Sequence, residues 1–163
     1  MGLVKVNSYC LLVDSMHEAE RGLFELQRGR PLCVTALGDD GAARTVLLAT
    51  VEGLSAQTLK QIQGIDNGRI CLVVTRYRAE AMGLTRADHG RTAISLALSD
   101  SVTPDEILSF SSSTRDYRAG SVDVRQAFPS EIGGLTLARL GRLLPAVVAV
   151  SVGESTASAV REL

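Results

Sequence analysis

The stretch Gly68-Arg69-Ile70-Cys71-Leu72-Val73-Val74-Thr75 decides the predicted fold. It follows Asn67, which forms a turn pair with Gly68, and then runs through apolar residues that leave no polar face. Such a run is typical of a strand that is covered on both sides. A short helical pattern follows from Arg76. The stretch therefore predicts a central buried strand with helices packed around it.

Composition favours one domain with an aliphatic core. The chain has 163 residues, of which 45% are hydrophobic, and this is enough for one sizeable core. It has no Trp, three Phe and three Tyr, so the core depends on Leu, Val, Ile and Ala. The net charge is −1 with acids and bases interspersed, whereas a nucleic-acid-binding protein needs a basic stripe. We expect a single domain over residues 1–163 and no nucleic-acid partner.

The cysteines and the apolar runs indicate the cellular compartment of the protein. Cys10, Cys33 and Cys71 are odd in number and lack metal-ligand spacing, which favours free thiols in a reducing compartment. The N-terminus is too polar for a signal peptide. The longest apolar run, residues 143–152, is too short to span a bilayer. We expect a cytoplasmic protein without a membrane partner.

Turn and capping signals divide the chain into short elements. Gly38-Asp39-Asp40-Gly41 predicts the tip of a hairpin. Thr103-Pro104-Asp105-Glu106 predicts a helix start, with Thr as the cap, Pro in the first turn and Glu three residues on. Phe128-Pro129 predicts an extended bend, Gly133-Gly134 a turn, and residues 145–152 a final buried strand. Six or seven strands that alternate irregularly with short helices predict an α+β (mixed α/β) domain.

Short motifs spread along the chain resemble one enzyme family. They are Gly29-Arg30-Pro31-Leu32-Cys33-Val34, Leu54-Ser55-Ala56-Gln57-Thr58-Leu59, Asn67-Gly68-Arg69-Ile70-Cys71-Leu72, Thr75-Arg76-Tyr77-Arg78-Ala79-Glu80-Ala81-Met82-Gly83-Leu84, Thr92-Ala93-Ile94-Ser95-Leu96, Phe128-Pro129, Gly133-Gly134-Leu135, Leu137-Ala138-Arg139-Leu140-Gly141 and Pro145-Ala146-Val147-Val148. Their order and spacing resemble dihydroxybutanone phosphate synthase, the riboflavin-pathway enzyme that converts ribulose 5-phosphate to a four-carbon phosphate and formate. The resemblance covers about residues 18–152. It implies a mixed sheet flanked by short helices, and a homodimer with active sites at the subunit interface.

The metal-binding residues of that family are not matched. The family carries a long acidic loop that ends in Glu-Gly-Asp and holds a divalent metal and the sugar, whereas the matching loop here keeps at most Asp39 and Asp40. The family's second metal ligand is the His after Arg-x-Gly. This chain has Arg142 there, and a guanidinium has no free lone pair for a metal. The family's helix after that His is interpreted as deleted, because Pro145 arrives only three residues later. The resemblance therefore implies a metal-independent protein without a cofactor.

Four residues are candidates for catalysis. Cys71 matches a position close to the substrate in the resembling family, and the alternative is a small buried core residue. Asp39 and Asp40 are remnants of the acidic loop, one acting as general base, or simply a good turn. His89 stands beside Asp88 in a loop rich in ionisable groups. It could move protons near neutral pH, or be an exposed loop histidine.

Hydroxyl and cationic side chains are the candidates for substrate binding. Ser113, Thr114 and Arg115 fall near the family's phosphate-binding segment, and either bind a phosphate or carboxylate or form an ordinary polar loop. Arg142 could hold an anionic group or polarise a carbonyl, unless the pocket has closed. Arg91 lies in the same loop as His89 and completes the set.

Three functions are consistent with these residues. The favoured one is a repurposed small-molecule enzyme of a specialised biosynthetic pathway, acting by isomerisation, dehydration or cyclisation on a small polar or anionic metabolite. The second is a non-catalytic binding or regulatory paralogue that keeps only the dimeric scaffold. The third is the activity of the resembling family, kept with unusual metal ligands. We expect this hypothesis to fail: ribulose 5-phosphate should give no dihydroxybutanone phosphate and no formate.

Overall fold

The computed structural model describes residues 10–12, 16–65, 69–84, 92–113, 123–153 and 156. Short strands alternate with short helices along the chain. In order, the elements are β1 (Cys10–Leu12), α1 (Met16–Gln27), β2 (Leu32–Leu37), β3 (Ala43–Thr50), α2 (Ala56–Gln63), β4 (Cys71–Thr75), α3 (Arg76–Ala81), β5 (Ala93–Ala97), α4 (Pro104–Ser112), β6 (Val124–Gln126), α5 (Pro129–Leu140) and β7 (Ala146–Val152).

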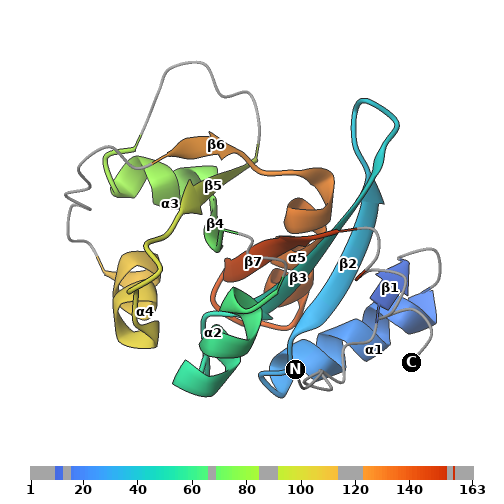
Figure 1. Ribbon diagram of the computed structural model, residues 1–163, viewed down its shortest axis with the longest axis horizontal. Coiled ribbons are helices and arrows are strands. Elements are labelled where there is room, and N and C mark those ends of the chain that lie inside the picture. The colour runs from blue at the N-terminus through green and yellow to red at the C-terminus, as the bar shows by residue number, and fades with distance from the viewer. Residues whose placement is uncertain are drawn as a thin grey trace.

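The strands form one seven-stranded sheet in the order β1-β2-β3-β7-β4-β5-β6 (Figure 1). β1 runs parallel to β2, and the other neighbouring pairs are antiparallel, so the sheet is mixed. β4 lies between β7 and β5, and Leu72, Val73 and Val74 are fully buried. The predictions of a central buried strand and of an α+β domain are therefore confirmed.

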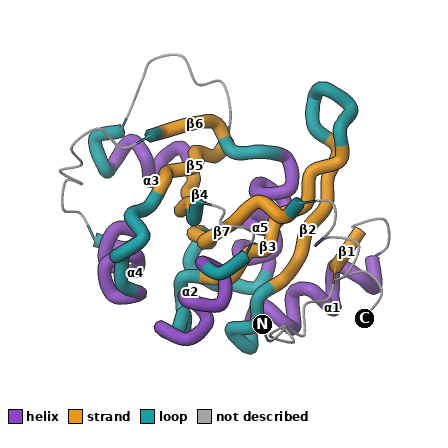
Figure 2. The backbone as a smooth tube through the Cα atoms, in the orientation of Figure 1, coloured by secondary structure: helices purple, strands orange, loops and turns teal. Residues whose placement is uncertain are grey.

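Both faces of the sheet are covered, because apolar side chains point alternately to its two sides. Leu72 and Val74 of β4 pack in a cluster with residues of α2 and α4, such as Ile62 and Ile107. Val73 packs on the opposite side, in a cluster with residues of α1 and α5. Figure 2 shows the strands running through the centre of the molecule with helices around them. Within the described ranges, none of the helices has the length and apolar content needed to cross a bilayer.

Two of the predicted turn and cap signals are confirmed. Thr103 caps α4, since its hydroxyl accepts a hydrogen bond from Glu106 N at 3.3 Å and Glu106 accepts one from Thr103 N at 2.8 Å. The predicted hairpin joins β2 and β3, whose last pair is Leu37 with Ala43. Figure 1 shows this hairpin projecting beyond the rest of the sheet. The predicted final strand is β7.

The predictions for residues 128–134 need correction. Phe128 has extended backbone angles, as a bend would, but it is the N-cap of α5, and Gly133 and Gly134 lie inside that helix. The predicted turn is therefore wrong. Gly134 is there because α5 lies directly on β3, where an added Cβ would press on Leu48. The helix predicted to be deleted would follow Arg142, whereas α5 ends before that residue, at Leu140, and β7 begins at Ala146.

The two adjacent glycines should respond oppositely to alanine. A Cβ on Gly134 would lie 3.2 Å from Cγ and Cδ1 of Leu48, with Cδ2 closer still, and Leu48 is fully buried. Overpacking of about 1–3 kcal/mol should exceed the helix gain of about 1 kcal/mol, so Gly134→Ala should lower the free energy of unfolding by up to about 2 kcal/mol. Urea unfolding measures this.

Gly133→Ala is the matched control on the same helix. A Cβ there would meet Val34 Cγ1 at 3.5 Å, an ordinary contact. The helix gain should remain, and we expect stability to rise by up to about 1 kcal/mol. Equal stabilities of the two variants would contradict the close packing of α5 on β3.

Candidate functional site

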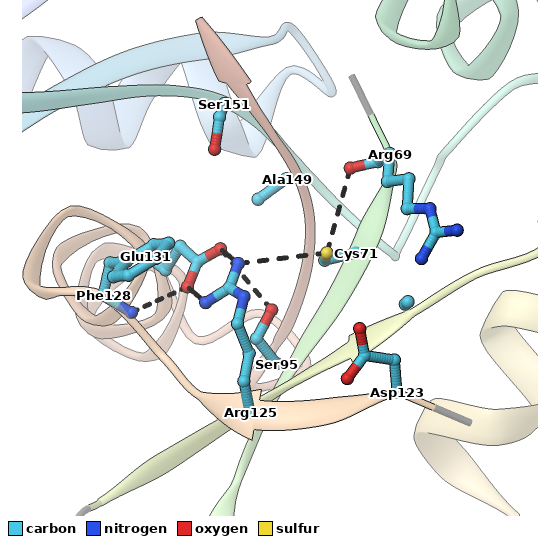
Figure 3. A pocket seen from close by; sticks show the side chains of 10 residues that line it. Arg69, Cys71, Ser95, Asp123, Arg125, Phe128, Glu131, Ala149 and Ser151 are labelled. Carbon is cyan, nitrogen blue, oxygen red and sulfur yellow. Dashed lines mark hydrogen bonds and ion pairs between the residues drawn. The ribbon is translucent and has the colours of Figure 1, made fainter. Parts of the chain in front are cut away.

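A pocket of about 220 Å³ lies beside the first turn of α5 (Figure 3). α5 packs across β2, β3, β7 and β4 and leaves the far end of the same sheet face uncovered. Residues from β4, β5, β6 and β7 form the pocket together with that first turn. The lining residues are Arg69, Cys71, Ser95, Ala97, Asp123, Arg125, Phe128, Glu131, Ala149 and Ser151.

Small side chains make the floor of the pocket. Cys71 pairs with Ala149 on one side and with Ala97 on the other, so these three residues form one row across the sheet. Ser95 stands two residues from Ala97 and faces the same side. Ser151 stands in the same relation to Ala149. Because these side chains are short, space remains above the sheet where α5 does not cover it.

An ion pair between a half-buried Arg and a buried Glu forms one wall. Arg125 Nη2 donates to Glu131 Oε1 at 2.7 Å, and Arg125 Nη1 donates to Oε2 at 2.9 Å. The same carboxylate accepts from Phe128 N at 2.7 Å and from Ser95 Oγ at 3.5 Å. Glu131 is only 1% exposed. Its carboxylate therefore joins β5, β6 and the first turn of α5.

Arg125 is held on its other sides as well. Its guanidinium lies 4.1 Å from the centre of the Phe128 ring, and Arg44 of β3 lies 4.5 Å from the same centre. Arg125 Nη2 also approaches Cys71 Sγ at 3.9 Å. Burial lowers the pKa of Arg125, but the hydrogen bonds and charge of Glu131 and the contact with Cys71 raise it more. Arg125 is therefore a fixed cation at any physiological pH.

The wall offers a guanidinium next to a thiol. The Cys71 S–H donates to the carbonyl of Arg69 at 3.8 Å, and Arg125 Nη1 also donates to Gln126 O at 3.0 Å. Of the five N–H donors of this guanidinium, two bind Glu131, one binds Gln126 and one points to Cys71 Sγ, which leaves Nε–H. A carbonyl or anionic oxygen in the pocket could take Nε–H or replace the long contact with Cys71.

The sequence-predicted residues are scattered. Cys71 lies on the pocket floor and is half-buried. Asp39 and Asp40 are exposed at the tip of the β2–β3 hairpin, outside the pocket lining. Asp40 accepts a hydrogen bond from Ala42 N at 3.1 Å and pairs with Arg44 at 2.6 Å. The hairpin thus reaches the pocket only through Arg44, which stacks on Phe128.

Two of the predicted cationic and hydroxyl residues, Arg142 and Ser113, are described by the structure and lie outside the pocket lining. Arg142 is exposed with φ 56° just beyond the C-terminal end of α5. This 12-residue helix spans about 18 Å, and the pocket is at its other end. Ser113 ends α4, where its carbonyl accepts a hydrogen bond from Arg78. The remaining candidates lie outside the described residues: His89, Arg91, Thr114 and Arg115.

The pair of Arg125 and Glu131 is missing from the sequence prediction, although one signal for it is visible. Pro129 in the first turn and Glu131 three residues after Phe128 repeat the pattern that marks the start of α4. That pattern places Glu131 at a helix start. It does not reveal Arg125, because only the pairing of β6 with β5 brings this side chain to the helix.

Comparisons with known proteins identify the fold. No protein-family model matches the chain, and no curated protein matches it. Among solved structures, a 3,4-dihydroxy-2-butanone 4-phosphate synthase of Candida albicans is 16% identical with a TM-score of 0.56, covering 83% of this chain and 80% of that one. A magnesium complex of such a synthase is 18% identical with a TM-score of 0.52, covering 82% and 74%.

A two-domain synthase from A. baumannii gives 17% identity and a TM-score of 0.56 over 84% of this chain. The present chain spans about half of that protein, 48% of its length. At these identities the comparisons establish the fold alone: the chain has the fold of 3,4-dihydroxy-2-butanone 4-phosphate synthase.

The residues at the start of α5, beside the pocket, do not suit a divalent metal. Phe128 and Pro129 at the start of α5 have no donor side chain for a metal. Arg125 and Phe128 N already donate to both oxygens of Glu131. In the described part of the chain, no three His, Cys, Asp or Glu side chains are grouped as metal ligands.

Removing Arg125 should destabilise the fold by leaving the Glu131 carboxylate buried without its cation. Arg125→Met should lower the free energy of unfolding by roughly 2–3 kcal/mol, less than for a fully buried pair because the Arg side chain is 34% exposed. Adding Glu131→Gln should restore most of the loss, since the amide oxygen can still accept from Phe128 N. Chemical denaturation of both variants measures this. A double variant no more stable than Arg125→Met would contradict the assignment.

Asp40 should titrate below its ordinary pKa of 3.8. The hydrogen bond from Ala42 N is the largest cause, and the hydrogen bond and charge of Arg44 add to it. A lowered pKa means that Asp40 stabilises the hairpin at neutral pH and loses this effect as pH falls through its folded pKa. NMR titration of the carboxyl carbon measures the pKa.

Arg44→Gln is the matched test for Asp40. It should raise the pKa of Asp40 only part of the way toward 3.8, because the hydrogen bond from the Ala42 amide remains. A pKa above 3.8 in the unmodified protein would show that Asp40 is not held as described.

Proposed function

We propose that this chain is a metal-independent enzyme that performs acid–base chemistry on a small polar or anionic metabolite in the pocket beside α5. The reaction class is isomerisation, dehydration or cyclisation, in a specialised biosynthetic pathway. The observation that carries the proposal is the ion pair of Arg125 and Glu131 in the pocket wall. A buried ion pair commonly stabilises a fold less than apolar residues of the same volume, so its presence beside a cavity supports a functional role.

The pocket residues have distinct roles in this proposal. Arg125 polarises a substrate carbonyl oxygen with a donor that Glu131 leaves free, which stabilises negative charge as it develops. Cys71, 3.9 Å from Arg125, carries the proton between carbon and oxygen. Glu131 is a positioning residue, because its oxygens fix the guanidinium and do not reach into free space.

The pocket volume limits the substrate. The pocket has a volume of about 220 Å³. Drug-sized ligands occupy pockets of about 300–1,000 Å³. The substrate is therefore a metabolite of a few carbon atoms, which agrees with the size of a small carbonyl compound.

A ligand-binding protein without turnover is the second candidate. Arg125 already donates to Glu131 and Gln126, which leaves few donors for a transition state. Phe24 and Leu140 are 50% and 66% exposed on α1 and α5, two helices that pack together. An apolar surface of this kind suits a dimeric scaffold that is kept for binding. Binding without chemistry would favour this candidate.

Deuterium exchange tests the enzymatic proposal directly. Small hydroxycarbonyl metabolites incubated with the protein in D2O should lose α-protons, as followed by NMR, because acid–base work next to a carbonyl exchanges these protons. Arg125→Lys keeps the charge and loses the paired geometry, and it should slow exchange about 100-fold. Cys71→Ser should slow it as well.

Arg139→Lys is the matched control, since Arg139 is exposed near the far end of the same helix. It should leave the exchange rate unchanged. Binding without exchange would replace the enzymatic proposal by the second candidate. If none of the metabolites binds, both are wrong.

A further inference from the structure

The charges around the pocket are separated into two groups. Arg125 and Glu131 neutralise each other in the inner wall. Arg69 and Asp123 remain at the rim, and neither makes an ion pair with another residue in the described ranges. The four charges sum to zero. The pocket therefore offers one open cation and one open anion without an overall excess of either sign.

Arg69 and Asp123 reach the rim from opposite sides of one small residue. Arg69 stands two residues before Cys71, whose partner in β5 is Ala97. Asp123 lies on the other side of β5, where its carbonyl accepts from Ala97 N at 3.0 Å. Figure 3 shows both charged side chains on the side of Cys71 that faces away from Glu131. The short side chain of Ala97 leaves the space between them open.

We propose that the ligand of this pocket is a small zwitterion of the amino-acid class. Its carboxylate binds the guanidinium of Arg69, and its ammonium group binds the carboxylate of Asp123. The rest of the ligand lies over Cys71 and extends toward Arg125. This inference rests on the proposed function and names the substrate class of the same site.

The alternatives fit the charges less well. A phosphate dianion would gain Arg69 but would lie close to Asp123, whose like charge raises the free energy of binding. An amine without an anionic group would gain Asp123 and lie close to Arg69. Only a ligand that carries both charges pairs each open group and leaves the pocket neutral.

A panel of four matched probes tests the proposal. L-alanine carries both groups, lactate lacks the ammonium, 2-aminopropanol lacks the carboxylate, and glycerol phosphate carries a dianion. Titration followed by NMR on the full chain should show that L-alanine binds about tenfold more tightly than each of the other three. Arg69→Gln and Asp123→Asn should each weaken L-alanine binding about tenfold.

Exposed residues elsewhere provide the controls. Arg139→Gln and Asp105→Asn remove one charge of each sign outside the pocket and should leave the affinity for L-alanine unchanged. The charge-exchanged double variant Arg69→Asp with Asp123→Arg should recover binding relative to either single reversal, because a zwitterion can turn around. Circular dichroism confirms that each variant is folded.

Two results would overturn the inference and leave the proposed function intact. One is lactate or glycerol phosphate binding at least as tightly as L-alanine. The other is unchanged L-alanine affinity in Arg69→Gln and Asp123→Asn. If no probe binds, the inference is overturned, and if no hydroxycarbonyl metabolite binds either, the proposed function fails as well.

Discussion

The buried carboxylate of Glu131 is the constraint on which the site depends. At 1% exposure it has no access to bulk water, so its oxygens must be satisfied by protein donors. Arg125, Phe128 N and Ser95 supply them from β6, the start of α5 and β5. These bonds fix where the helix begins relative to the sheet. They also fix the point on the sheet beyond which α5 no longer covers it. The pocket opens at that point.

Much of the fold could be predicted from the sequence, because its signals are local. The unbroken apolar run of β4, the hairpin glycines and the cap at Thr103 each act within a few residues. Gly133-Gly134 is misread because a glycine pair marks a turn as readily as a helix that lies very close to a strand. Among the predicted site residues that the structure describes, Cys71 alone lines the pocket. Arg125 could not be predicted, because its role depends on the pairing of β6 with β5.

The comparison with the synthase fold bears on the role of the ion pair between Arg125 and Glu131. A TM-score of 0.56 with 16% identity means that the scaffold is kept while most side chains differ. One of the synthase structures is a complex with two magnesium ions. At the start of α5 in this chain, the guanidinium of Arg125 stacks on Phe128. A guanidinium has a fixed position and fixed donors, so it favours a narrower chemistry than an exchangeable metal ion.

The central claim is that Arg125, rather than a divalent metal, provides the positive charge at the start of α5. A crystal structure of the protein grown with excess Mn²⁺, with anomalous diffraction data to locate the metal, tests it most directly. We predict that Glu131 stays paired with Arg125 through both oxygens and that no anomalous peak appears within 4 Å of the carboxylate. A manganese ion bound to Glu131, with the Arg125 guanidinium displaced, would contradict the account.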